Sequence, residues 1–437
     1  MKIKLLILLS LTLAFALDTQ AGSATWNLNP INGDWNTAAN WTPPTVPNGA
    51  SDVATFGTSN QTEISLSAPV TVAQITFDTD VKYNITCPAG TSLTFTGFGI
   101  RRIDARTGSP QTFTVGPAES AGGNPGALVF TGESAARGVT IINNGGTAPG
   151  LAGGTTTFQD SSGGGATLIA NGGTNGGAGG VIQFLDHAIG EKAPVEIYGN
   201  GTLLIDSSSS VTELKSIAGD GQVILNNTLH INAGAGTFSG VISGSGGLII
   251  GQGSQTLTGA NTYSGRTHVQ LGSLIVSNTT GSGTGSGDVL VSRGLLGGVG
   301  IIAGDVTLNK GFGFPFLSPG NSLPPETDDI GTLTIRKKLK FGIRGQYICL
   351  VDGDTGASDL VVANFVSIDP TAMLDLSENG TAPVGMTFTI IESTGSSPIV
   401  GTFMNLPDGG TITAGNNTFQ ASYSGGDGND LTLTVVP

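Results

Sequence analysis

The chain has 437 residues, of which 71 are glycine and only 11% are charged, and its formal net charge is −14. Such low charge, with 38% hydrophobic residues, is not the composition of a disordered chain, and glycine without a G-X-Y period excludes collagen. A chain this acidic repels phosphate groups, so we expect no binding to nucleic acid.

Residues 1–21 have the pattern of a secretory signal peptide. Lys2 and Lys4 precede an apolar run over 5–17, and Ala21 ends an acceptable small-residue cleavage site. The run is shorter than the ~20 residues of a transmembrane helix, and we expect no transmembrane segment later in the chain. The sequence therefore predicts an exported protein, secreted or on the cell surface, with the periplasm as a further possible location.

Residues 22–58 contain all three tryptophans of the chain, Trp26, Trp35 and Trp41. Stacked β-architectures must cover their terminal layers, because an open layer presents unpaired strand edges to other chains. We therefore predict that this segment is an N-terminal aromatic cap. The alternative is a platform of exposed rings on which a glycan stacks.

Residues 59–437 consist of short β-forming runs separated by glycine, serine and asparagine turns, with no helical periodicity. Two glycine-rich patches, 144–154 and 162–180, are expected to project from the coils or to hinge them. Burial of the apolar side chains of a single coil of about 22 residues contributes roughly 10 kcal/mol to stability. Ordering its backbone costs on the order of 22–44 kcal/mol, so coils are stable only when stacked on one another. The sequence predicts one all-β, elongated domain.

Stacking also predicts the state of the two cysteines, Cys87 and Cys349. At about 22 residues per coil and ~4.8 Å per layer, their separation in sequence places them far apart along the column. A disulfide needs Cα atoms within ~7 Å, so we expect two free, mostly buried thiols.

A repeat at about 244–322 carries a family resemblance. A Gly-Ser-Gly-Gly-Leu start at 244–248 is followed by 255–265, Gln-Thr-Leu-Thr-Gly-Ala-Asn-Thr-Tyr-Ser-Gly, and by 272–276, Gly-Ser-Leu-Ile-Val. These segments resemble the autotransporter-associated β-strand repeat, and 295–300 and 317–322 are similar to the sequence that trails it. The Trp-rich start and the tail, at 388–391 and 423–430, are also similar to such proteins.

The resemblance implies a right-handed parallel β-helix and an exported, passenger-like role as a structural or adhesive surface protein. The family repeat is thought to help passenger transport and is assigned no active site, so the resemblance implies no catalytic residues, cofactor or metal. Autotransporters also end in an outer-membrane translocating domain, and nothing in the printed sequence resembles one. The secretion route beyond the inner membrane is therefore not implied.

Asparagines are expected at the corners of the coils. Corners need positive φ, which glycine adopts freely and asparagine tolerates, and an asparagine side chain can bond neighbouring backbone. The sequence predicts this role for Asn227, Asn261 and Asn278.

Catalytic signatures are missing from the sequence, and the three histidines, His187, His230 and His268, have no motif partner. Residues 425–430 fit the start of a calcium-binding nonapeptide once, but Thr432 stands where a large apolar residue belongs. The Asp352–Gly356 segment opens like an EF-hand loop, but Ala363 occupies the position of the bidentate glutamate. Both are therefore interpreted as turns.

An alternative function is a carbohydrate-active enzyme, a lyase or hydrolase, on the same scaffold. Such enzymes combine paired carboxylates with basic residues along an exposed groove. The candidate residues for this chemistry are Arg101, Arg102, Asp104, Arg137, Asp160 and Asp186.

Basic residues cluster near 336–344, and the members are Arg336, Lys337, Lys338, Lys340 and Arg344. Such a cluster can bind an anionic polysaccharide, although a solvated strand face is the more ordinary interpretation. The expected partner of the protein is a polysaccharide or cell-surface glycan, and the coil ends are a further place for self-association.

Overall fold

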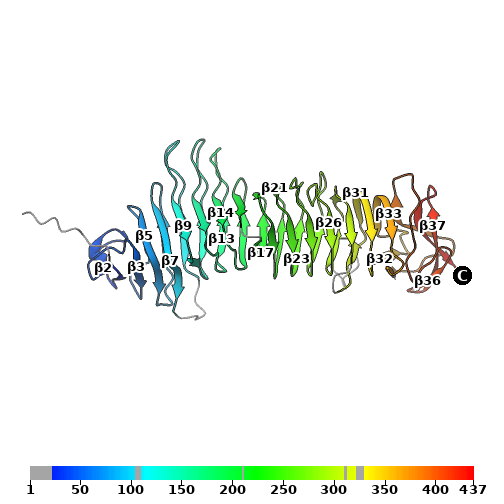
Figure 1. Ribbon diagram of the computed structural model, residues 1–437, viewed down its shortest axis with the longest axis horizontal. Helices are drawn as coiled ribbons and strands as arrows, with labels where there is room; N and C mark the ends of the chain where they lie inside the picture. Colours follow the sequence, from blue (N-terminus) through cyan, green and yellow to red (C-terminus); the bar gives the residue numbers. More distant parts are fainter. Residues whose placement is uncertain (1–21, 104–109, 209–210, 310–312, 321–328) are drawn as a thin grey trace, which may run out of the picture.

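Successive coils of the chain lie one above another along a single long column (Figure 1). The computed structural model describes residues 22–103, 110–208, 211–309, 313–320 and 329–437. These residues form strands and one 3-10 turn, η1 (Ala38–Asn40). The predicted signal peptide, residues 1–21, and the candidate Asp104 lie outside them.

The first sheet runs along the N-terminal half of the column, and all its pairs except β1 with β2 are parallel. Its strands, in spatial order, are β2 (Trp41–Thr42), β1 (Ala24–Trp26), β3 (Gly49–Phe56), β5 (Val70–Phe77), β7 (Ser92–Arg102), β9 (Ala127–Thr131), β12 (Thr155–Gln159), β14 (Val181–Asp186), β16 (Thr202–Ser207), β18 (Gln222–Leu225) and β21 (Val241–Gly244), with β10 (Ala135–Ala136) beside β7.

A second parallel sheet begins opposite the first one. Its N-terminal strands are β4 (Glu63–Ser65), β6 (Asn84–Cys87), β8 (Thr112–Val115), β11 (Thr140–Asn143), β13 (Thr167–Ala170), β15 (Ala193–Ile197) and β17 (Thr212–Gly219). At β17 this sheet splits into two ladders of strands. The start of β17 pairs with β19, and its last residue pairs with β20.

Two ladders continue from that division toward the C-terminus. The first contains β19 (Leu229–Ile231), β22 (Leu248–Ile250), β24 (Thr267–Val269), β26 (Val289–Val291) and β29 (Val306–Leu308). The second contains β20 (Gly234–Phe238), β23 (Gly253–Leu257), β25 (Ser273–Val276), β27 (Leu295–Gly298), β30 (Phe316–Pro319), β32 (Gln346–Asp352) and β34 (Met373–Asn379).

Near the C-terminus the strands are longer, and one long strand pairs with two shorter ones. Parallel pairs connect β28 (Ile301–Ile302) and β29 to β31 (Thr332–Phe341), and β31 to β33 (Leu360–Ile368). The fold is thus a parallel β-helix, which confirms the predicted fold class. Its coils are less uniform than expected: paired positions are 19 residues apart at Gly234 and Gly253, but 28 apart at Ala127 and Thr155.

The C-terminal strands depart from the parallel pattern. β38 (Asp430–Val436) is antiparallel to both β35 (Thr387–Ser393) and β37 (Asn417–Gly425), and β36 (Thr411–Ala414) is antiparallel to β37. The sequence predicts one continuous stack over 59–437, and the antiparallel strands at its C-terminal end depart from that prediction. The division of the chain into a signal peptide at 1–21, a cap at 22–58 and a β-helix at 59–437 remains a prediction.

Alternating side chains enter the core between the sheets. In β12, for example, Thr156 and Phe158 are buried and their neighbours point outward, and the other strands repeat this period of two. Four phenylalanines at one register position, Phe95, Phe130, Phe158 and Phe184, stack with ring centroids 4.7, 5.0 and 4.8 Å apart. Each coil therefore covers the aromatic face left open by the coil before it.

The glycine-rich patches form loops that stack beside the column (Figure 1). Gly146 N–H donates to Ala178 O at 2.7 Å, and Ala178 N–H donates to Leu151 O at 3.0 Å. A Cβ atom on Gly153 would overlap the carbonyl oxygen of Gly179, so this close stacking requires glycine there. The predicted loop at 162–180 is interrupted by strand β13 at Thr167–Ala170.

Candidate functional site

The tryptophan segment forms a closed aromatic cluster at the N-terminal end of the column. Trp26, Trp35 and Trp41 are at most 2% exposed, and their ring centroids lie 5.9, 5.6 and 5.5 Å from that of Phe56. Each indole N–H donates to a backbone carbonyl, for example Trp41 Nε1 to Trp35 O at 2.7 Å. All three rings are buried and cannot stack on a sugar. The alternative of a glycan-binding platform at this segment is therefore not supported.

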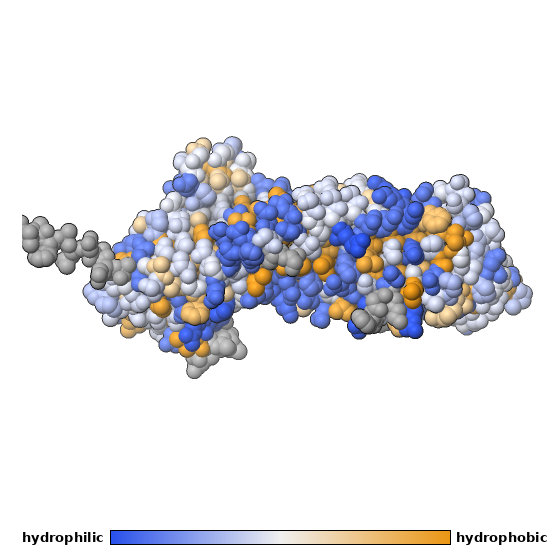
Figure 2. All heavy atoms as spheres, viewed as in Figure 1, coloured by the Kyte–Doolittle hydropathy of each residue, from blue (hydrophilic) through white to orange (hydrophobic). Residues whose placement is uncertain are grey.

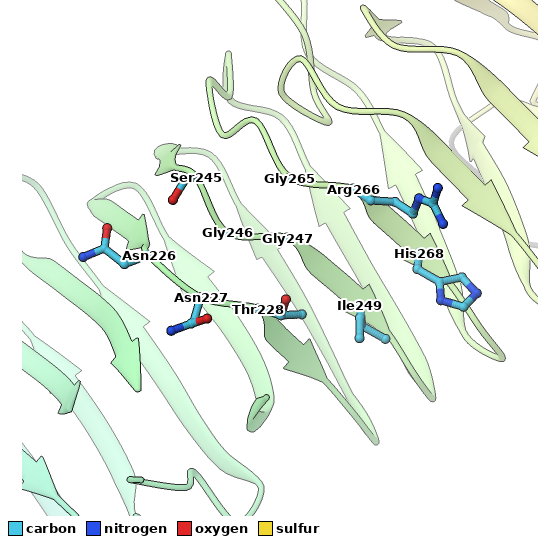
Figure 3. Close-up of a pocket in the computed structure, with 10 residues that line it drawn as sticks. All are labelled: Asn226, Asn227, Thr228, Ser245, Gly246, Gly247, Ile249, Gly265, Arg266 and His268. Atoms are coloured by element: carbon cyan, nitrogen blue, oxygen red, sulfur yellow. The ribbon is translucent and has the colours of Figure 1, made fainter. Parts of the chain in front are cut away.

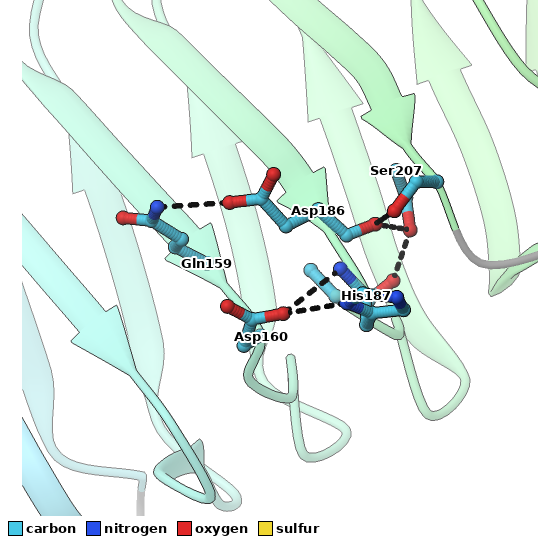
Figure 4. A network of polar contacts seen from close by, with 7 residues as sticks. Gln159, Asp160, Asp186, His187 and Ser207 are labelled. Atoms are coloured by element: carbon cyan, nitrogen blue, oxygen red, sulfur yellow. Dashed lines mark hydrogen bonds and ion pairs between the residues drawn. The ribbon is translucent and has the colours of Figure 1, made fainter.

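Two of the enzyme candidates meet at a corner of the column. Asp160 follows β12 and Asp186 ends β14, and the parallel register of these strands places them on adjacent coils. Both have positive φ, 50° and 53°. His187 Nδ1 lies 2.8 Å from Asp160 Oδ1, and Gln159 Nε2 donates to Asp186 Oδ2 at 2.8 Å, as Figure 4 shows.

The electrostatics of this corner disfavour Asp160 as the general acid of a glycosidase. The hydrogen bond from His187 holds the pKa of Asp160 below its ordinary value, whereas a general acid needs a raised pKa. In the described part of the chain no ion pair joins Arg101, Arg102 or Arg137 to either carboxylate. The structure thus brings Asp160 and Asp186 together but not with the candidate arginines, and Asp104 cannot be placed.

The other two histidines share one outward-facing position. His230 in β19 pairs in register with Ile249, and Ile249 pairs with His268 in β24. Burial lowers the pKa of both rings, with Arg266 adding to the effect on His268. His268 Nε2 lies 2.8 Å from Ser292 Oγ. The 19-residue spacing of these coils aligns the histidines, which the expected coil length of about 22 residues does not predict.

A polar hollow of about 390 Å³ lies next to this position, at the corner between β21 and β22 and their neighbouring coils (Figure 3). Three successive coils contribute its lining residues, which are Asn226, Asn227, Thr228, Ser245, Gly246, Gly247, Ile249, Gly265, Arg266 and His268. We call it the corner hollow. No carboxylate lines it, although the chain is acidic.

The predicted basic cluster lies on β31 and the turn after it. Arg336, Lys337, Lys338 and Lys340 are exposed, as expected for a solvated strand face. Arg344 lies 5.6 Å from the ring centroid of Phe314, beside an apolar hollow of about 260 Å³ that Met373 and Met404 also line. In Figure 2 the hydrophobic colour on this side of the molecule gathers over the C-terminal half of the column.

The two calcium-like segments are turns whose carboxylates accept backbone hydrogen bonds. Asp352 Oδ1 accepts the N–H groups of Asp354 and Thr355, and Asp430 Oδ1 accepts that of Ser393. Across the described ranges, no three His, Cys, Asp or Glu side chains converge as a metal site would need. No helix in these ranges has the length and apolar character of a membrane span.

The prediction for the three corner asparagines is confirmed in part, and the prediction for the two cysteines is confirmed. Asn227, Asn261 and Asn278 do bond backbone, and Asn261 links Ile242 N and Gly283 O on the coils on either side of it. Their φ angles are not positive, so that part of the prediction is wrong. Cys87 and Cys349 are free and buried, as predicted, and burial raises the pKa of Cys87 to about 12.

Comparisons with known proteins give a partial similarity. No protein-family model matches the chain. Over 76 residues, 17% of the chain, it is 45% identical to the adhesin BmaC autotransporter of Brucella suis biovar 1 (strain 1330), and it spans 2% of that protein's length. The crystal structure of the Haemophilus influenzae Hap adhesin aligns with 90% of this chain and 62% of its own, at 10% identity and a TM-score of 0.25. Part of this chain is therefore similar to an autotransporter adhesin.

Proposed function

We propose that this protein is an exported, passenger-like surface protein that adheres to other molecules and carries no catalytic site. The observation that carries the proposal is the 45% identity over 76 residues with a protein described as an autotransporter adhesin. The repeat at about 244–322 supports membership of the autotransporter-associated β-strand repeat proteins. A long column of coils also suits adhesion, because it offers many layers of outer surface for contact.

Beads coated with the mature chain test the adhesive part of the proposal. They are expected to attach to immobilised polysaccharides or cell surfaces more than beads coated with a globular protein of similar negative charge. Equal attachment of both kinds of bead would contradict adhesion. Antibody labelling of intact producing cells tests export, and labelling that appears only after the inner membrane is opened would contradict it.

The carbohydrate-active enzyme remains a second candidate because Asp160 and Asp186 lie on adjacent coils. We expect no release of reducing sugars from polysaccharides by the protein, because the lowered pKa of Asp160 disfavours it as the general acid and no candidate arginine forms an ion pair with either carboxylate among the described residues. Release that is abolished by Asp186→Asn would replace the proposal with a catalytic function. Self-association through the coil ends also remains a proposal, and sedimentation over a range of concentrations tests it.

A further inference from the structure

Close stacking of the coils creates the corner hollow. A Cβ atom on Gly246 would overlap the carbonyl oxygen of Asn227, and one on Gly265 would overlap that of Gly246. These positions therefore remain glycine for the sake of the coil contacts, and the floor of the hollow has few side chains. Figure 3 shows Asn226 and Ser245 toward one end of the hollow and Arg266 and His268 toward the other.

The walls combine neutral polar groups with one cation. Asn226, Asn227, Thr228 and Ser245 supply amides and hydroxyls, which are the groups that bond sugar hydroxyls. Asn227 Nδ2 donates to Ser207 O at 2.6 Å, which fixes this amide beside the hollow. No tryptophan, tyrosine or phenylalanine lines the hollow, so we expect a ligand there to bind mainly through polar contacts.

Arg266 gives the hollow its charge. It is exposed, and the ion pairs of the described residues join only His187 to Asp160 and His230 to Glu213. The pKa of His268 is lowered by burial and by Arg266, so at neutral pH this ring is uncharged. The hollow therefore carries a single positive charge in a fork geometry that matches a carboxylate.

The net charge of −14 does not prevent an anion from binding at this corner. At physiological ionic strength charges are screened over about 8 Å, so a ligand in the hollow responds mainly to the groups that line it. One cation among amides and hydroxyls fits a sugar with one carboxylate per ring better than a densely sulfated or phosphorylated polymer.

We propose that the corner hollow binds the carboxylate-bearing sugar of an acidic polysaccharide, with Arg266 on the carboxylate and the amide and hydroxyl side chains on the ring hydroxyls. This inference names a ligand class for the proposed adhesive function. The hollow is open on its outer side, so a long polymer can pass along the column while one ring occupies the site.

Calorimetric titration of the full mature chain tests the inference. The probes are trimers of galacturonate, glucuronate and mannuronate, each with its methyl ester as an uncharged match. We expect at least one free-acid trimer to bind, and its methyl ester to bind at least 10-fold more weakly. If none of the three acids binds at millimolar concentration, or if an ester binds as well as its acid, the inference is wrong.

Matched arginine variants locate the site. Arg266→Gln is expected to weaken binding of the acid at least 10-fold, whereas Arg293→Gln, which removes an exposed arginine outside the hollow, should leave it unchanged. Equal losses in both variants would point to general charge attraction and overturn the site. Circular dichroism of each variant confirms that the fold is kept.

The bead assay separates the two proposals. If beads attach to cells but no uronate trimer binds, the adhesive function stands and the ligand inference fails. If a trimer binds through Arg266 but beads do not attach, the inference stands and the adhesive function fails.

Discussion

Single amide side chains complete hydrogen bonding between coils where the main chain cannot. Gln255 Nε2 donates to Ile217 O at 3.1 Å and to Gly236 O at 3.0 Å, which bridges two coils inside the core. Asn261 does the same at a corner, to Ile242 and Gly283. The asparagine contacts were predictable from residue type, but the buried Gln255 was not, because its role depends on β17 and β20 pairing at only one position.

Replacing Asn261 by alanine should destabilise the protein. Two buried backbone groups, Ile242 N–H and Gly283 C=O, would lose their partner, at about 1–3 kcal/mol for each. Urea denaturation measures the change in the free energy of unfolding. Asn124→Ala, at an exposed loop position, is the control and should change it by less than about 0.5 kcal/mol. Equal stability of the two variants would contradict the assigned role.

Asp359 makes stability depend on pH. It is 3% exposed, its two oxygens accept the N–H groups of Gly331 and Leu350, and burial, with Asp329 adding, raises its pKa from 3.8 to about 7. Because the folded state holds this proton more tightly than the unfolded state, the stabilisation is complete below pH 3.8 and is lost as the pH rises through 7.

The expected loss from this residue between pH 4 and pH 8 is about 4 kcal/mol at most. Asp359→Asn removes the titrating proton, so its free energy of unfolding should fall less over this range than that of the wild type. Denaturation midpoints at pH 4, 6 and 8 make the comparison. Parallel curves for the two proteins would show that Asp359 is ionised in the folded state throughout.

Strands are the elements that the sequence predicts well. Alternation in segments such as Leu93-Thr94-Phe95 and Val181–Leu185 identified β-strands that the structure contains. The pairing between them was not predictable, because the step from one coil to the next varies. Phe95 pairs with Phe130 and Phe130 with Phe158, so the phenylalanine stack does not follow a fixed period in sequence. The corner hollow was likewise invisible, since its lining comes from three coils.

The phenylalanine stack predicts a large effect of Phe130→Ala. The ring is fully buried between Phe95 and Phe158, so its loss leaves a cavity that costs about 3–5 kcal/mol. Phe98→Ala removes a ring that is 65% exposed and should cost little. The difference in thermal midpoint between the two variants measures the contribution of stacking, and similar midpoints would contradict it.

The whole molecule is a column with two covered ends. Buried tryptophans close the N-terminal end, and antiparallel strands lie at the C-terminal end. The short β-forming runs between glycine, serine and asparagine turns predicted correctly that coils must stack rather than form a compact core. The change of strand direction near the C-terminus was missed, because β35 to β38 have the same alternating pattern as the parallel strands.

The central claim is that each coil is held in place by its neighbours along one axis. Small-angle X-ray scattering of the mature chain tests it most directly. The account predicts an asymmetric pair-distance distribution, with an early maximum set by the cross-section and a long tail set by the column. A symmetric, bell-shaped distribution, as a globular particle gives, would contradict it.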